Sequence, residues 1–269
     1  MSTAVEFLVT KEYRRFEEFC HACHRDRYVG LCYGPPGVGK TLSARQYARW
    51  DMLEPYLDAW SNAERVRQGP YGQLAACHTV LYTPTVTATA RSLEREIAGL
   101  VMQMNCVVDH ARAAQATPDS AGEREPCTLL IVDEADRLKM QGLEQLRDFY
   151  DRGAVGLVLI GMPGLEKRLA RYPQLYSRVG FAHAFRPLSE EEMAFILRHH
   201  WAALGRQLDP TQFTDQEAVA AIIRITAGNF RLLNRLVAQI RRITALNSLQ
   251  TITREVVEVA RECLVIGTT

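Results

Sequence analysis

The sequence predicts an α/β fold with a parallel five-stranded sheet, followed by a smaller all-helical domain. Short apolar, β-prone runs alternate with helix-like segments through residues 28–186. A glycine-rich turn joins the first of these runs to the next helix, an arrangement that suits phosphate binding. From Pro187 onward the pattern indicates four helices and no strand. We therefore expect an α/β nucleotide-binding domain over residues 28–186 and a helical lid domain over residues 187–269.

The glycine-rich turn is Gly34-Pro35-Pro36-Gly37-Val38-Gly39-Lys40-Thr41, which fits G-x-x-x-x-G-K-[ST] at every fixed position. It follows the apolar run Tyr28 to Tyr33 and precedes a segment, Leu42 to Trp50, that can continue as a helix. Glycines let successive backbone N–H groups point into one concavity. A Gly/Pro turn that matches by chance is the alternative, and the strand–turn–helix context disfavours it. The turn predicts a nucleoside triphosphate site.

Each residue type in this turn has an expected role. Lys40 would reach the β- and γ-phosphates, and the Thr41 hydroxyl would bind Mg²⁺. The residues expected to contact the nucleotide are Gly34, Pro36, Gly37, Val38, Gly39, Lys40, Thr41 and Leu42. Residues 1–27 are predicted to supply a helix that packs beside the nucleotide.

A second motif supports the same chemistry. The apolar run Thr128 to Val132 ends in Asp133-Glu134. Asp133 would hold Mg²⁺ through the metal's water shell, and Glu134 would orient and polarise the attacking water. The alternative is a carboxylate pair that caps a helix starting at Ala135. The phosphate-binding turn upstream favours the catalytic interpretation, because the two motifs predict each other.

The other elements follow from periodicity and from Gly/Pro breaks. The predicted strands are 28–33, 77–83, 128–132, 155–160 and 179–185. The predicted helices of the first part are 10–24, 42–50, 88–105, 135–150 with an interruption near Gly142, and 164–172. Residues 51–73 should be irregular with short helical pieces, and residues 112–126 a flexible surface loop. Helices 189–204, 215–227, 230–246 and 251–265 complete the lid, with Ser189 as the N-cap of the first.

Composition is that of an ordinary globular protein, with 47% hydrophobic residues, 23% charged residues and a net charge of +1. The net charge gives no global signature for nucleic acid or membrane, so DNA binding requires a local patch. The sequence contains no 18-residue apolar stretch and no leader pattern at its start. We therefore expect a cytoplasmic protein that does not associate with a membrane. Of seven cysteines, Cys20 and Cys23 form a C-x-x-C without a second ligand pair, so we interpret them as buried packing residues rather than as a zinc site.

Taken together, the motifs resemble those of AAA+ ATPases, and within them the transposition regulators of the MuB, TnsC and TniB type. The resemblance covers nearly the whole chain. It rests on five stretches: Gly34 to Thr41, Leu129 to Asp136, Leu159 to Pro163, Ser177-Arg178, and Gly228 to Leu233. The first two stretches are common to many ATPases. The last three narrow the resemblance to this group or to its near relatives, the ExeA-type and helicase-loader ATPases.

The resemblance implies roles that spacing alone does not give. Arg178 looks like the arginine finger that reaches a neighbouring subunit's γ-phosphate, with Arg168 and Arg171 as rivals and a plain surface arginine as the alternative. Arg231 looks like the sensor arginine of the lid. Its alternative is a solvated helix face, because Arg231, Arg235 and Arg242 share one stripe. At the sensor position after strand 155–160 stand Gly161, Met162 and Pro163, where the family usually has a polar residue. This departure suggests slow hydrolysis.

The resemblance also implies partners. The loop Thr83 to Arg91 matches a DNA-facing loop by position, with Thr85 and Thr87 as hydroxyl donors and Arg91 as a cation. The alternative is a helix start capped by Thr87 or Thr89. The function implied is an ATP- and Mg²⁺-dependent protein that forms a ring or helical filament on double-stranded DNA. It would direct a transposase, with a target-selector protein as a further possible partner. The rivals are a secretion or signalling ATPase of ExeA type with a protein partner, and a helicase loader.

Overall fold

The computed structural model describes residues 7–57, 69–115, 127–153, 155–203, 208–209 and 211–264. The chain forms two compact units, and neither is a single stretch of sequence. The first unit comprises Met1–Glu12, Pro35–Gly39 and Arg186–Thr269, and the second comprises Tyr13–Gly34 and Lys40–Phe185. We call these the helical unit and the sheet unit and describe each by itself.

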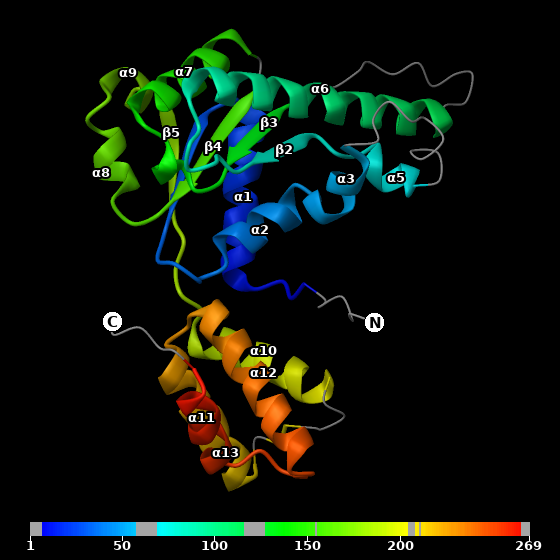
Figure 1. The fold of residues 1–269 in the computed structure, drawn as a ribbon, viewed down its shortest axis with the longest axis vertical. Coiled ribbons are helices and arrows are strands. Elements are labelled where there is room, and N and C mark those ends of the chain that lie inside the picture. Colours follow the sequence, from blue (N-terminus) through cyan, green and yellow to red (C-terminus); the bar gives the residue numbers. More distant parts are fainter. Residues whose placement is uncertain are drawn as a thin grey trace. The chain divides into compact units, whose positions relative to one another are not determined.

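The sheet unit contains five strands that are all paired in parallel (Figure 1). They are β1 (Val29–Tyr33), β2 (Thr79–Tyr82), β3 (Leu129–Val132), β4 (Gly156–Gly161) and β5 (Val179–Ala184), in the spatial order β2-β3-β4-β1-β5. β2, β3 and β4 are buried along their whole length, as their continuous apolar sequences require, whereas β5 at one edge alternates half-buried and exposed residues. The predicted five-stranded parallel sheet is confirmed.

Among the residues of this part that the structure describes, nine helical segments flank or connect the strands (Figure 1). They are α1 (Lys11–Asp26), α2 (Lys40–Tyr47), α3 (Trp50–Leu57), α5 (Tyr71–Leu74), α6 (Ala90–Gln115), η1 (Ala135–Arg137), α7 (Met140–Arg152), α8 (Leu165–Leu169) and α9 (Pro173–Tyr176). α1 packs on the sheet through its aromatic and sulfur side chains: the ring of Phe19 stacks on His183 of β5, with ring centroids 5.5 Å apart.

Cys20 and Cys23 lie on this packed face of α1, and both are completely buried. Burial raises the pKa of the Cys23 thiol to about 12. A Cβ added to Gly30 of β1 would lie 2.4 Å from the Cys23 sulfur, so helix and strand are in close contact here. The packing interpretation of this pair is confirmed. Among the described residues no group of three or more His, Cys, Asp or Glu is placed to hold a metal ion.

Three predicted boundaries in the sheet unit are wrong. α6 continues ten residues past Asn105 to Gln115, into the predicted loop, because Val107, Val108 and Ala111 are buried and its last five residues, 111–115, are good helix formers. The rest of that predicted loop, residues 116–126, lies outside the described residues. The break after Glu134 falls at Leu138-Lys139 and not at Gly142, which lies inside α7. The helix predicted for 164–172 ends at Leu169, and Pro173 starts the unpredicted α9.

The helical unit contains α10 (Glu190–Ala203), α11 (Phe213–Thr226), α12 (Phe230–Leu246) and α13 (Arg254–Glu262). Their apolar faces enclose one core, in which Trp201, Ile222 and Leu236 are almost completely buried. α10 begins with the predicted Ser189 cap. The Ser189 hydroxyl accepts from the Glu192 N–H at 3.2 Å, and the Glu192 carboxylate accepts from the Ser189 N–H at 3.0 Å. In the described part of the chain, no helix has the length and apolar character needed to span a bilayer.

Candidate nucleotide site

Lys40 and Thr41 stand at the first turn of α2, directly after the glycine-rich turn. The Lys40 side chain is anchored, because its ammonium donates to the Gly34 carbonyl at 2.6 Å and the residue is only 9% exposed. Gly34 cannot be replaced without a shift of the backbone: an added Cβ would lie 2.3 Å from the Phe185 carbonyl oxygen. A buried cation is thus held at the end of β1, where a phosphate needs it.

Thr41 and Asp133 meet across 92 residues of sequence. The Thr41 hydroxyl donates to a carboxylate oxygen of Asp133 at 2.6 Å. Asp133 follows β3 and is 3% exposed, and its N–H donates to the Tyr82 carbonyl of neighbouring β2 at 2.8 Å. The parallel sheet places β1 and β3 so that both carboxyl ends reach the same edge. Hydroxyl and carboxylate oxygens are the hard ligands that Mg²⁺ takes, so these residues fit a magnesium–nucleotide complex.

The turn after β3 holds Glu134 in an unusual conformation. Its φ is +52°, in the left-handed region that a residue with a side chain rarely adopts. The strained backbone is supported by Asp133, whose second carboxylate oxygen accepts from the Glu134 N–H at 2.9 Å. The Glu134 side chain makes no capping hydrogen bond to the following η1 helix. The alternative in which this carboxylate serves as a helix cap therefore finds no support at Glu134.

Arg137 connects the Glu134 carboxylate to the end of β2. Its guanidinium forms an ion pair with Glu134, and Nη1 donates to the Pro84 carbonyl at 3.1 Å. Pro84 is buried and is the second residue of the loop Thr83 to Arg91, for which either a DNA contact or a helix start is predicted. Sequence reasoning did not identify Arg137. Its position three residues after Glu134, on a short helix, was the available signal.

The non-polar sensor position is explained by the backbone around it. The Met162 N–H donates to the Asp136 carboxylate at 3.1 Å, and a Cβ added to Gly161 would lie 2.7 Å from the same oxygen. Only glycine allows this close approach. Arg168, a rival for the finger, donates to the backbone carbonyls of Asp136 and Leu138. Arg168 therefore fixes the turn after β3.

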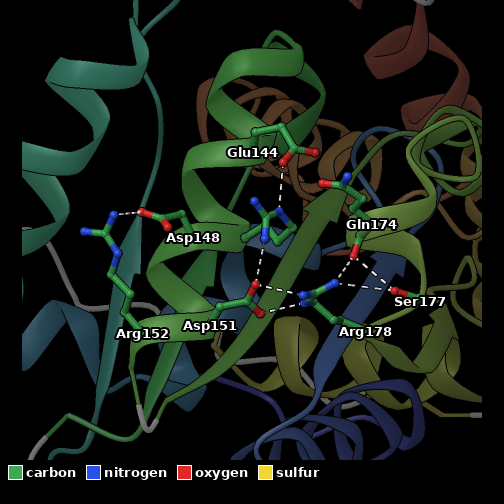
Figure 2. Close-up of polar contacts among 8 residues, drawn as sticks. Glu144, Asp148, Asp151, Arg152, Gln174, Ser177 and Arg178 are labelled. Carbon is green, nitrogen blue, oxygen red and sulfur yellow. Dashed lines mark hydrogen bonds and ion pairs between the residues drawn. The ribbon is translucent and has the colours of Figure 1, made fainter.

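Arg178 lies between α9 and β5 and is held by Asp151 at the end of α7 (Figure 2). Nε donates to one oxygen of this carboxylate at 2.6 Å and Nη2 to the other at 2.8 Å. Nη1 donates to the Gln174 carbonyl. Hydrogen bonds from Arg178 lower the pKa of Asp151 below its ordinary value. The Arg178 side chain stays 32% exposed, whereas Arg171, the other rival, is exposed on the turn between α8 and α9.

The predicted DNA loop leads from β2 to α6. Thr89 caps α6, since its hydroxyl accepts from the Ser92 N–H at 3.1 Å and the Ser92 hydroxyl accepts from the Thr89 N–H at 3.0 Å. The capping role of the alternative thus belongs to Thr89. Thr85, Thr87 and Arg91 are all exposed.

In the helical unit the glycine-rich segment Pro35–Gly39 packs with the start of α12. Gly37 and Gly39 have φ values of +80° and +115°, which residues with side chains rarely adopt. The Arg231 N–H donates to the Gly37 carbonyl at 2.9 Å, and the Arg231 side chain is exposed. Asn229, the cap of α12, also contacts this segment, a contact that sequence reasoning missed.

Comparison with known proteins identifies the family. A profile described as "AAA domain" matches residues 23–169, more than half of the 269 residues. The chain belongs to the AAA domain family. It is an ATPase of the AAA+ type, with the nucleotide-binding motifs that this family carries.

Two curated proteins are similar to this AAA+ chain. A "Potential ATP-binding protein" of Staphylococcus aureus is 43% identical over 272 residues, covering 99% of each chain. The "Mu-like prophage FluMu DNA transposition protein B" of Haemophilus influenzae is 30% identical over 218 residues, which cover 77% of this chain and 63% of that protein.

Solved structures share the fold. The Thermotoga maritima RuvB Holliday junction branch migration motor matches with a TM-score of 0.58 at 18% identity, over 96% of this chain and 70% of that chain. The Aeropyrum pernix Orc1 protein in complex with DNA matches with a TM-score of 0.58 at 20% identity, over 93% of this chain and 64% of that one. At these identities the likeness establishes the AAA+ fold.

Proposed function

We propose that this AAA+ ATPase assembles on double-stranded DNA in its ATP-bound state and recruits or activates a transposase at target sites, with hydrolysis driving disassembly. The observation that carries the proposal is the 30% identity, over 77% of the chain, to a prophage DNA transposition protein B. The exposed threonines and arginine of the loop Thr83 to Arg91 support a contact with the phosphate backbone that does not depend on base sequence.

Each residue of the nucleotide site has a separate proposed role. Lys40, already buried as a cation, binds the β- and γ-phosphates, and the backbone at Gly37 and Gly39 accommodates them. Thr41 and Asp133 hold Mg²⁺, which when bound neutralises charge on the phosphates. Glu134 orients the attacking water. Arg178 reaches the γ-phosphate of a neighbouring subunit, and Arg231 contacts nucleotide from the lid.

Near-neutral net charge implies weak DNA binding by one subunit, so binding gains strength when many subunits assemble together. For this reason we expect the binding of ATP and the binding of DNA to be coupled. Where ATP favours contacts between subunits, it also favours occupancy of DNA.

The test is binding to a labelled duplex with ATP, with ADP and without nucleotide, at several salt concentrations. We expect ATP-dependent binding that weakens steeply with salt, because phosphate contacts release counterions. Lys40→Ala should abolish it, since the variant lacks the cation that compensates the phosphates. Glu134→Gln should retain ATP, lose hydrolysis and form longer-lived DNA complexes.

Two outcomes would contradict the proposal as a whole, and a third would contradict its last step. Hydrolysis and assembly without any DNA binding would point to a protein partner, as in the secretion ATPases. Lys40→Ala complexes as abundant as those of the parent would show that nucleotide does not control assembly. If a transposase encoded beside this protein does not bind the DNA-bound assembly, only the proposed recruitment of a transposase is wrong.

A further inference from the structure

Asn229 makes two contacts that point in different directions. Its side-chain oxygen accepts from the Leu232 N–H at 3.1 Å and so caps α12. Its side-chain nitrogen donates to the Pro36 carbonyl at 3.0 Å, 193 residues away in sequence. Two residues further on, the Arg231 N–H donates to the Gly37 carbonyl at 2.9 Å. Two consecutive carbonyls of the glycine-rich segment are therefore bonded to the first turn of one lid helix.

The shape of the segment depends on this neighbour. A Cβ at Gly37 would lie 2.5 Å from the Asn229 oxygen and 3.1 Å from the Arg231 Cβ. Gly37 is thus required for its positive φ and for the close approach of α12. The two carbonyls bonded to α12 point toward the lid helix, which fixes the orientation of the peptide planes that follow them.

The turn that carries Asn229 is held by hydrogen bonds within the lid. Ala227 and Gly228 both have positive φ, 45° and 78°. The Gly228 carbonyl accepts from the Leu188 N–H at 2.9 Å, and the Asn229 N–H donates to the Thr226 carbonyl at 2.8 Å. A side chain on Gly228 would lie 2.4 Å from the Leu188 carbonyl oxygen. Asn229 is therefore presented by a turn that the lid core holds in place.

We propose that Asn229 is a positioning residue that holds the glycine-rich segment in its phosphate-binding shape by tying the Pro36 carbonyl to the first turn of α12. One side chain serves both the segment and the helix cap, so Asn229 adds a side-chain link between the lid and the loop beside the backbone bond from Arg231 to Gly37. The inference rests on the proposed nucleotide site and names the residue that maintains it.

Asn229→Ser separates the two contacts. Serine is a good N-cap, so it keeps the bond to the Leu232 N–H, but its side chain is too short to reach the Pro36 carbonyl. We expect the dissociation constant for a fluorescent ATP analogue to rise about three- to tenfold, the factor expected for loss of one hydrogen bond. The KM for ATP should rise alike, with kcat at saturating ATP within about twofold of the parent, because no catalytic group is removed.

A second readout needs no nucleotide. Hydrogen exchange of the amides at Gly37, Val38 and Gly39 should be faster in nucleotide-free Asn229→Ser than in the nucleotide-free parent. A parent that does not bind ATP would overturn the proposed function, while this exchange measurement would still test Asn229. Unchanged exchange together with parental ATP affinity would overturn the inference.

Thr253→Ala is the matched control. Thr253 caps α13 of the same lid by accepting from the Val256 N–H at 3.4 Å. Asn229→Ala and Thr253→Ala both remove a lid cap, and we expect similar losses of thermal stability. Only Asn229→Ala should weaken ATP binding and speed exchange at residues 37–39. Equal loss of ATP affinity in both variants would show that Asn229 acts only as the N-cap of α12, and the inference would be wrong.

Discussion

Glu134 illustrates how one neighbouring residue can constrain a side chain proposed for catalysis. Its carboxylate is paired with Arg137, and Arg137 is also bonded to the Pro84 carbonyl. A carboxylate oxygen that is bonded to a guanidinium is not available to accept a hydrogen bond from a water molecule. The pairing therefore restrains the residue proposed to polarise the attacking water.

Arg137→Ala should raise ATP hydrolysis measured without DNA by roughly two- to fivefold, the factor that corresponds to about 0.5–1 kcal/mol of exposed ion pairing. The measurement is steady-state phosphate release. Arg152→Ala, which breaks the exposed pair with Asp148 on α7, is the control and should leave the rate unchanged. A slower Arg137→Ala enzyme would mean that Arg137 supports the active position of Glu134.

Arg178→Ala tests the finger in trans. ATP affinity of the dilute protein should barely change, because all the other proposed phosphate contacts come from the subunit that binds the nucleotide. Hydrolysis stimulated by DNA should fall by a factor on the order of 10³. Mixing Arg178→Ala with Lys40→Ala should restore some activity, since certain interfaces would join an intact lysine to an intact finger. Co-assembly without rescue would exclude action in trans, and near-parental activity of Arg178→Ala alone would mark an arginine that only pairs with Asp151.

At the level of elements, two glycines show how differently the same residue type is used. Gly156 begins β4, and an added Cβ would lie 2.4 Å from the Cys23 carbonyl oxygen at the end of α1. Gly99 lies inside α6, and nothing in the described residues comes within 4 Å of an added Cβ there.

Gly156→Ala should therefore destabilise the fold by about 1–3 kcal/mol, because strand and helix must separate. Gly99→Ala should stabilise it by about 0.5–1 kcal/mol through helix propensity and a less flexible unfolded chain. Urea unfolding followed by circular dichroism gives both values. The same sign for the two substitutions would contradict the close packing of α1 on β4.

The elements themselves were largely predictable, and their errors have local causes. Strands β1 to β4 follow from apolar runs, because buried parallel strands need no alternation, and the edge strand β5 was predicted although only half-buried. The break at Leu138 was missed because Gly142 is the more obvious helix breaker. In the fold Gly142 leaves room for the Leu138 side chain, whose Cδ2 would lie 3.2 Å from an added Cβ. A sequence pattern does not reveal such a contact.

At the level of the whole molecule, the candidate site was predicted only as far as its motifs extend. The residues of Gly34 to Thr41 and Asp133-Glu134 are recognisable from spacing. The pairs Arg137–Pro84, Arg178–Asp151 and Asn229–Pro36 are not, since each joins segments that periodicity treats separately. The grouping of Pro35–Gly39 with the helical unit also escapes any division into consecutive ranges.

The stability of the whole fold should depend on pH through His78, just before β2. Burial, followed by the charges of His24, His21 and Arg49, lowers the pKa of His78 to about 4. The imidazole of His24 stacks on it, with ring centroids 4.5 Å apart. In the unfolded chain His78 regains its ordinary pKa of about 6.5. Between about pH 6.5 and 4 the unfolded state therefore binds a proton at His78 that the folded state does not bind. The free energy of unfolding falls as pH drops through this range.

His78→Asn should flatten this dependence, as measured by the thermal midpoint at pH values between 7.5 and 4. His110→Asn, at an exposed position on α6, should leave the slope as it is in the parent. Parallel curves for His78→Asn and the parent would show that another group is responsible.

Burial of the cysteines has a practical consequence for optical experiments. Cys20, Cys23, Cys32, Cys77 and Cys127 are buried, and burial raises the pKa of Cys77 and of Cys127 to about 11. Maleimides react with the thiolate, so these sulfurs should resist labelling in the folded protein. Cys263 is exposed directly after α13, and Cys106 is half-buried. Brief treatment of the unaltered chain should therefore place a dye on Cys263 first, which makes the lid the natural carrier of a fluorescent reporter.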